Sequence, residues 1–197
     1  MLSELNQCCE RFEAVQPTIN EIKHGLYKQY YQKACDRFKS YVDNQNTHRR
    51  AIGVFGAYLS HLEIHRSQIN NPKPYMILED DAKIEAETFT ELREMIENSY
   101  FEDWDIIRST WNARQKVFKF RRVHRESKFR RAFGNHNYFG GAHFSVFKDA
   151  KKIVNYLEEE NMMAIDSAYS TCKLNVYCKK LGVEALEEEF GTNIPKE

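Results

Sequence analysis

The chain has 197 residues, and its 29 lysines and arginines balance its 29 aspartates and glutamates to a formal net charge of zero. With 42% hydrophobic residues, a chain of this length can bury a core without disulfides, so we expect one globular domain over residues 1–197. The neutral total argues against a nucleic-acid-packaging protein, which carries a strong basic excess. Nucleic acid is therefore not an expected partner.

The sequence favours a soluble chain in a reducing compartment. No apolar run approaches the roughly 20 residues that a membrane-spanning helix needs, because the longest run, at 51–59, is closed by Ser60 and His61. The first residues lack the basic and apolar regions of a secretory signal. The 5 cysteines are an odd number without a C-x-x-C pair, which is typical of reduced thiols. We expect a cytoplasmic protein with no membrane span.

The first third of the chain predicts one strand and two helices. Residues 10–15 have the pattern of a short strand, and Thr18 with Glu21 forms a capping box that opens a helix through about Tyr41. A second helix is predicted over 51–67. Its apolar residues step by three and four and so share one side: Ile52, Phe55, Leu59 and Leu62.

Strands and helices alternate in the remainder. In chain order we expect a strand at 75–78, a helix around 89–96, strands at 104–110 and 138–147, a helix at 150–157 and a last strand at 174–178. This order predicts an α/β domain with a mixed, mainly parallel central sheet flanked by helices. Such sheets bind ligands beyond the carboxyl ends of their strands.

Three consecutive acids, Glu79, Asp80 and Asp81, follow the predicted strand at 75–78. Several like charges at the end of a buried strand normally need a cation. Mn²⁺ and Mg²⁺ accept carboxylate oxygens and keep positions open for water and phosphate, so these acids could anchor a metal–diphosphate complex. The alternative is a solvated turn or the first turn of a helix.

A basic stretch at 114–131 is concealed by the neutral total, since it contains nine lysines and arginines against Glu126 alone. These cations could bind a diphosphate or another anionic ligand, with Arg121 and Arg122 as first candidates. Phenylalanines interleave with them, which would also suit single-stranded nucleic acid. The third interpretation is a solvated face on a β-hairpin.

The predicted helix at 51–67 carries several candidate residues. His61 and His65 stand four residues apart and could hold zinc, although the glutamate of a His-Glu-x-x-His site is absent. Ser60 precedes His61 without a Gly-x-Ser-x-Gly elbow, so helix packing or a ligand pocket is the favoured role. Gly53 and Gly56 predict a close backbone approach to a strand or a ligand, or ordinary packing.

Taken together, the segments Gly53-Val-Phe-Gly56-Ala-Tyr-Leu-Ser60-His61 and Leu78-Glu79-Asp80-Asp81-Ala82 resemble the family 25 glycosyltransferases of lipopolysaccharide and procollagen type. In that family a Gly-x-x-Gly-x-x-x-Ser-His helix precedes a Leu-Glu-Asp-Asp strand end. Further similar segments follow in the family's order: Asp103-Trp-Asp-Ile-Ile107, Gly140-Gly-Ala-His-Phe-Ser-Val-Phe-Lys-Asp-Ala150, Ile165-Asp166 and Leu174-Asn-Val-Tyr-Cys178. The resemblance covers most of the chain.

The resemblance implies a GT-A type fold, a nucleotide-diphosphate sugar donor such as a UDP-sugar, and Mn²⁺ or Mg²⁺. The reaction would be an inverting transfer to a hydroxyl of a glycan or glycoprotein acceptor. Asp81, with Asp80, would form the metal site, and Glu79 or Asp80 would contact the ribose or a metal-bound water. The metal would neutralise the departing diphosphate, and Asp166 would be the general base.

The resemblance also implies a set of donor-binding residues, namely Glu79, Gly53, Gly56, Ser60, His61, Gly140, Gly141 and His143. The sequence departs from the family at two places. Val54 and Ala57 stand where the family has Glu and Cys, and the chain reaches Glu10 without the family's first hydrophobic strand and Arg-rich turn. These departures favour the alternative function, a non-catalytic GT-A-like domain that binds anions or RNA through residues 114–131.

Overall fold

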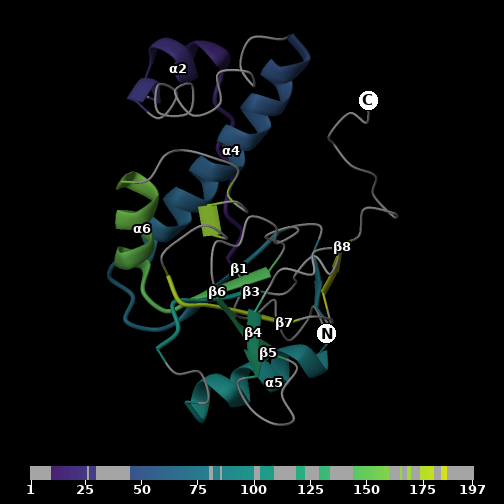
Figure 1. The fold of residues 1–197 in the computed structure, drawn as a ribbon. Helices are drawn as coiled ribbons and strands as arrows, with labels where there is room; N and C mark the ends of the chain where they lie inside the picture. Colours follow the sequence, from purple (N-terminus) through teal and green to yellow (C-terminus); the bar gives the residue numbers. More distant parts are fainter. Residues whose placement is uncertain are drawn as a thin grey trace.

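A computed structural model describes residues 10–25, 27–29, 45–79, 82–84, 86–99, 103–108, 119–122, 129–133, 144–159, 165, 168–169, 174–179 and 183–185. Its elements, all but β2 labelled in Figure 1, are α2 (Ile19–His24), α4 (Gln45–Ser67), β1 (Tyr75–Leu78), β2 (Ala82–Ile84), α5 (Ala86–Glu97), β3 (Ile106–Arg108), β4 (Lys119–Arg122), β5 (Phe129–Phe133), β6 (Phe144–Phe147), α6 (Ala150–Glu159), β7 (Val176–Lys179) and β8 (Val183–Ala185). The alternation of helices and strands confirms a mixed α/β fold.

The start of α2 confirms the predicted capping box. The backbone N–H of Thr18 donates to the Glu21 carboxylate at 2.7 Å, and the Glu21 N–H donates to the Thr18 hydroxyl at 3.2 Å. The helix then ends at Gly25, whose N–H donates to the Glu21 carbonyl at 3.1 Å. The prediction of one continuous helix from residue 18 is therefore wrong at Gly25, and residues 30–44 lie outside the described residues.

The strand predicted at 10–15 is also wrong, because these residues form no strand. The N–H of Val15 instead donates to the side-chain oxygen of Ser60, so this donor is satisfied by α4 rather than by a neighbouring strand. The helix predicted at 51–67 is confirmed as the carboxyl-terminal part of α4. The helix predicted at 150–157 is confirmed as α6, and its buried residues are the expected ones: Ala150, Ile153, Val154 and Leu157.

The described strands form a six-stranded mixed sheet in the order β1-β6-β3-β7-β5-β4 and a two-stranded sheet of β2 and β8. The expectation of a mainly parallel sheet is wrong. Among the described strands only β3 and β7 pair in parallel, because β6 lies between β1 and β3 and runs antiparallel to both, and β5 runs antiparallel to β4 and β7. Strands β1, β3 and β7 nevertheless share one direction, so their carboxyl ends lie at one edge of the sheet.

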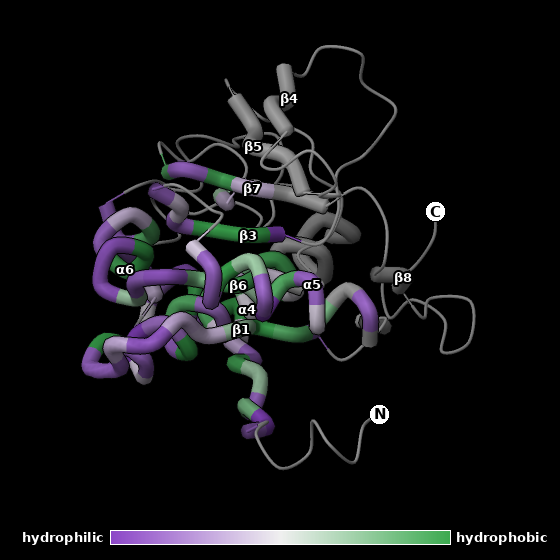
Figure 2. Tube along the Cα trace, turned by 90° about the horizontal axis from the view of Figure 1, so that it is seen from below, coloured by the Kyte–Doolittle hydropathy of each residue, from purple (hydrophilic) through white to green (hydrophobic). Residues whose placement is uncertain are grey.

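Helices cover both faces of the sheet. Helices α4 and α6 pack on one face through a core that includes Leu62, Ile106 and Leu157, and α5 packs on the other through Leu92, Met95 and Ile107. Figure 1 shows α5 on the side of the sheet away from α4, and Figure 2 shows hydrophobic residues gathered along β1, β3 and β6 between these layers. No helix in the described ranges has the length and apolar composition that a bilayer span requires.

Candidate functional site

The face of α4 that carries the Gly-x-x-Gly-x-x-x-Ser-His motif meets the segment before α2. A Cβ atom at Gly56 would lie 2.8 Å from the carbonyl oxygen of Val15, so only glycine allows this backbone approach. The hydroxyl of Ser60 accepts the Val15 N–H at 2.8 Å and donates to the Gly56 carbonyl at 2.7 Å. The close approach predicted for Gly56 is therefore made to this segment, which docks on α4. At Gly53, by contrast, an added Cβ would meet nothing within 4 Å.

The next residues of the motif begin a chain of buried polar side chains between α4 and the sheet. The Tyr169 hydroxyl lies 3.0 Å from Nδ1 of His61 and 2.6 Å from Nε2 of His65. The other ring nitrogen of His65, Nδ1, lies 2.6 Å from the Tyr75 hydroxyl. Nε2 of His61 lies 3.7 Å from Oε1 of Glu79, beyond hydrogen-bond length but within ion-pair range. The chain thus runs from Tyr75 at the start of β1 to Glu79 just past its end.

Burial determines the protonation states of His65 and Tyr75. Burial, with a smaller contribution from His61, holds the pKa of His65 well below its ordinary value, so this imidazole is neutral. Burial and the nearby Asp149 raise the pKa of Tyr75, so its hydroxyl keeps its proton. Both residues are therefore neutral at physiological pH. His65 has a single N–H to donate in a hydrogen bond, and Tyr75 has a single O–H.

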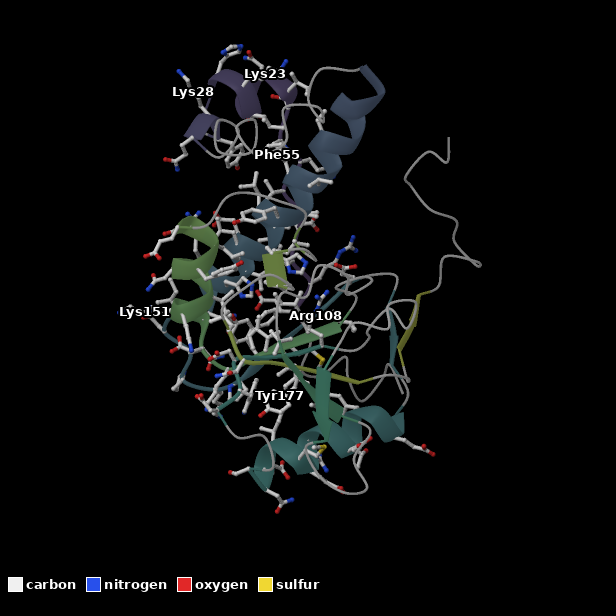
Figure 3. All side chains as sticks on the ribbon, in the orientation of Figure 1. Lys23, Lys28, Phe55, Arg108, Lys151 and Tyr177 are labelled. Atoms are coloured by element: carbon white, nitrogen blue, oxygen red, sulfur yellow. The ribbon has the colours of Figure 1, made fainter. Side chains whose placement is uncertain are left out.

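Aromatic contacts hold the rings of the chain. The His65 ring meets Phe147 edge-on with centroids 4.5 Å apart, and Tyr169 is tilted against the same Phe147 at 5.1 Å. The guanidinium of Arg108, which is fully buried, lies 5.9 Å from the centre of the Tyr169 ring. Figure 3 shows Arg108 on the α4 side of the sheet, whereas Tyr177 lies toward α5. Tyr169 is thus fixed from two sides as well as by its hydroxyl.

The polar chain ends at the carboxyl edge of the sheet. Glu79 follows β1 directly and its side chain is 29% exposed. Near this edge one register row crosses all six strands, through Ile77, Ser145, Arg108, Cys178, Arg130 and Arg122. The hairpin of β4 and β5 thus places two basic positions in the row of Arg108. Arg121 lies in the adjacent row, paired with Arg131.

Several predicted site residues lie outside the described residues, namely Asp80, Asp81, Gly140, Gly141, His143 and Asp166. Their roles stay predictions, as do the donor-binding roles of Gly53, Gly56, Ser60, His61 and Glu79. Within the described ranges, no three His, Cys, Asp or Glu side chains are placed to hold a metal ion. The zinc role considered for His61 and His65 finds no third ligand there, since the Tyr169 hydroxyl occupies the space between the two rings.

Sequence reasoning missed Tyr75, Tyr169 and Arg108. The four-residue spacing of His61 and His65 did indicate one shared helix face, which the structure confirms. Tyr169 is more than a hundred positions away from both histidines along the chain, and no local pattern marks it as their partner. Tyr75 and Arg108 stand at strand ends, where a polar side chain carries no signal beyond that of an ordinary strand boundary.

A second polar cluster lies at the opposite, amino edge of the sheet, beside an open hollow of about 590 Å³. Here Asp105 accepts the Asn175 N–H at 2.9 Å and the Lys152 ammonium at 2.7 Å. These bonds join the starts of β3 and β7 to α6. The part of the Asp-Trp-Asp-Ile-Ile segment that precedes β3 is therefore used to assemble the sheet.

The sequence was also compared with known proteins. No protein-family model matches it, and no curated protein matches it either.

Proposed function

We propose that this protein is a metal-dependent glycosyltransferase of GT-A type, which transfers a sugar from a nucleotide-diphosphate donor to a hydroxyl of a glycan or glycoprotein. The observation that carries the proposal is the position of Glu79, which opens the acidic triplet at the carboxyl end of β1. Open α/β sheets bind their ligands at this edge.

The arrangement of the matched segments supports the proposal. The motif helix is α4, and the strands of the other matched segments are β1, β3, β6 and β7, which are neighbours in one sheet. Matched segments far apart along the chain thus share one sheet, and the end of β1 and the start of β6 lie side by side at its carboxyl edge. The register row through Arg122 and Arg130 adds basic positions there, which suits a diphosphate or an anionic acceptor.

The carboxylate oxygens available at this edge suit a hard divalent cation. Glu79 is a partly exposed carboxylate, and the next two residues in the sequence are Asp80 and Asp81, so oxygen donors predominate. Asp81 and Asp80 would hold Mn²⁺ or Mg²⁺, which supplies charge neutralisation for the leaving diphosphate. Glu79 would orient the ribose or a water, and Asp166 would accept the proton of the acceptor hydroxyl.

A calorimetric titration of UDP and GDP, with and without Mn²⁺, tests the proposal. We expect UDP to bind only when Mn²⁺ is present. Asp81→Asn should abolish this Mn²⁺-dependent binding, because it removes the negative charge of a metal ligand. The matched control is Asp103→Asn, which makes the same change at the opposite edge, where Asp103 accepts a hydrogen bond from the Asn175 amide. This control should bind as wild type does.

Two results would sink the proposal. One is nucleotide binding that does not depend on the metal or is unchanged in Asp81→Asn. The other is binding of polyanions in general, without Mn²⁺ and falling steeply with salt, which would favour an anion- or RNA-binding domain using residues 114–131. If UDP binding depends on Mn²⁺ as expected, release of UDP from a panel of UDP-sugars in Mn²⁺ would identify the donor sugar.

A further inference from the structure

We propose that Tyr169 is a positioning residue for the carboxylate of Glu79, and that it acts by fixing the tautomer of His61. The inference deepens the proposed function, on which its meaning for donor binding rests. Its geometric basis is the chain of contacts from Tyr75 through His65, Tyr169 and His61 to Glu79.

Counting protons narrows this chain to two arrangements, and the Glu79 carboxylate decides between them. The Tyr169 hydroxyl has one proton and lies within hydrogen-bond distance of two imidazole nitrogens, so at most one of them can accept from it, and an imidazole that does not accept donates. His65 is neutral and therefore carries a single N–H. If that proton is on Nε2, it donates to Tyr169, and Nδ1 of His65 accepts the proton of Tyr75.

In this arrangement every contact has one donor and one acceptor. Tyr169 then donates to Nδ1 of His61, which places the proton of a neutral His61 on Nε2, the nitrogen that faces Glu79. The opposite arrangement puts the His65 proton on Nδ1, from which it donates to the oxygen of the Tyr75 hydroxyl, so this contact fits either arrangement. It also puts a proton on Nδ1 of His61, so that a neutral His61 would turn a lone pair toward the Glu79 carboxylate.

The assigned arrangement therefore aims an N–H at Glu79 from a ring that cannot easily turn. The His61 side chain is 6% exposed, and Tyr169 is held by Phe147 and Arg108. At 3.7 Å the N–H orients the carboxylate electrostatically or through one water. Removing a partner that orients a metal ligand commonly changes metal affinity by about 10- to 100-fold, and because Tyr169 acts through His61 we expect the low end of this range for nucleotide binding.

The first test measures the tautomers without any ligand, by ¹⁵N NMR of the imidazole nitrogens. We expect both His61 and His65 to carry the proton on Nε2 in the wild type. Tyr169→Phe removes only the hydroxyl and should release His61 into a mixture of tautomers. The matched control is Tyr58→Phe, because the Tyr58 hydroxyl is also buried but donates to the Leu157 carbonyl outside this chain. This control should leave the His61 signals unchanged.

The second test is a double-mutant cycle on the Mn²⁺-dependent affinity for UDP. Tyr169→Phe should weaken this affinity about tenfold in the wild-type background. In the Glu79→Gln background it should have little further effect, because the group that it positions has lost its charge. A purely structural role of Tyr169 would give equal effects in both backgrounds.

The outcomes separate this inference from the proposed function. A wild-type His61 with its proton on Nδ1, or His61 signals unchanged in Tyr169→Phe, overturns the positioning role whatever the protein binds. If the tautomers are as expected but UDP binding does not depend on Mn²⁺, the proposed function is overturned and the positioning role is not. If Tyr169→Phe does not fold, the ¹⁵N shifts of His65 in the wild type test the same chain, and a His65 proton on Nδ1 rather than Nε2 would contradict the assignment.

Discussion

The two faces of the sheet differ sharply in what they bury. Under α5 the buried residues form an apolar cluster with Leu92, Met95 and Ile107 at its centre. Under α4 and α6 the core also encloses polar side chains that are less than a tenth exposed: His61, His65, Arg108 and Ser145. A single strand serves both faces, since Ile107 packs toward α5 and the next residue, Arg108, lies on the other side.

The buried polar groups under α4 add less stability than apolar packing would. Burying a polar group without a partner costs about 1–3 kcal/mol, and a hydrogen-bonded one contributes little more than an apolar residue of its size. The Ser145 hydroxyl illustrates the cost, because it is buried and has no hydrogen-bond partner among the described residues. An apolar face would be the more stable solution, so the polar chain is explained better by the carboxylate at its end.

The largest expected effect concerns the apolar face. Ile107→Ala removes a fully buried side chain, and such a change typically costs about 2–5 kcal/mol of unfolding free energy. Urea unfolding followed by circular dichroism would measure this loss. Because Ile107 belongs to the face under α5, the molecules that remain folded should bind Mn²⁺ and UDP as the wild type does. A loss below about 1 kcal/mol would show that this face is not a packed core.

The polar face should make stability depend on pH. The pKa of His65 is held well below its ordinary value of 6.5, so below that pH the unfolded chain binds one more proton than the folded chain. Stability should therefore fall as the pH drops from about 6.5, by about 2 kcal/mol between pH 7 and pH 5 from this group. In His65→Gln this part of the slope should disappear. An equal slope in both proteins would contradict the buried, neutral state of His65.

The two glycines of α4 test how closely the segment before α2 docks on this helix. Gly56→Ala places a Cβ 2.8 Å from a backbone oxygen, and overpacking of this kind costs about 1–3 kcal/mol. Gly53→Ala meets no atom within 4 Å and should stabilise the helix by about 0.5–1 kcal/mol. Thermal unfolding of both variants checks the opposite signs. Equal shifts would mean that the segment at Val15 does not dock on α4.

Local patterns predicted the elements whose signals are local. The Thr18–Glu21 capping box and the apolar spacing in α6 are both confirmed, because they rest on contacts within one helix turn or along one helix face. The strand at 10–15 was wrong because a serine side chain on α4 satisfies the Val15 N–H. The sheet was not mainly parallel because β6 inserts between two strands that precede it in the sequence.

In the candidate site, too, some residues were predicted from local motifs and others are brought together only by the tertiary fold. Glu79 and His61 were found from motifs, and the structure brings them to within 3.7 Å of each other. Tyr169 could not be found, because only the tertiary fold brings its hydroxyl between two histidines. A residue of this kind carries no spacing, charge pattern or motif in the sequence, and its role emerges only when the hydrogen-bond partners are known.

Whether the polar face positions Glu79 is tested by the Mn²⁺-dependent affinity for UDP of two variants, each altered on a different face of the sheet. Ile107→Val and Tyr169→Phe should each cost about 1 kcal/mol of stability, so general weakening of the fold is matched between them. We expect Ile107→Val to bind within about twofold of wild type and Tyr169→Phe about tenfold more weakly. Equal affinities for the two variants would contradict the claim that the polar face positions the carboxylate of Glu79.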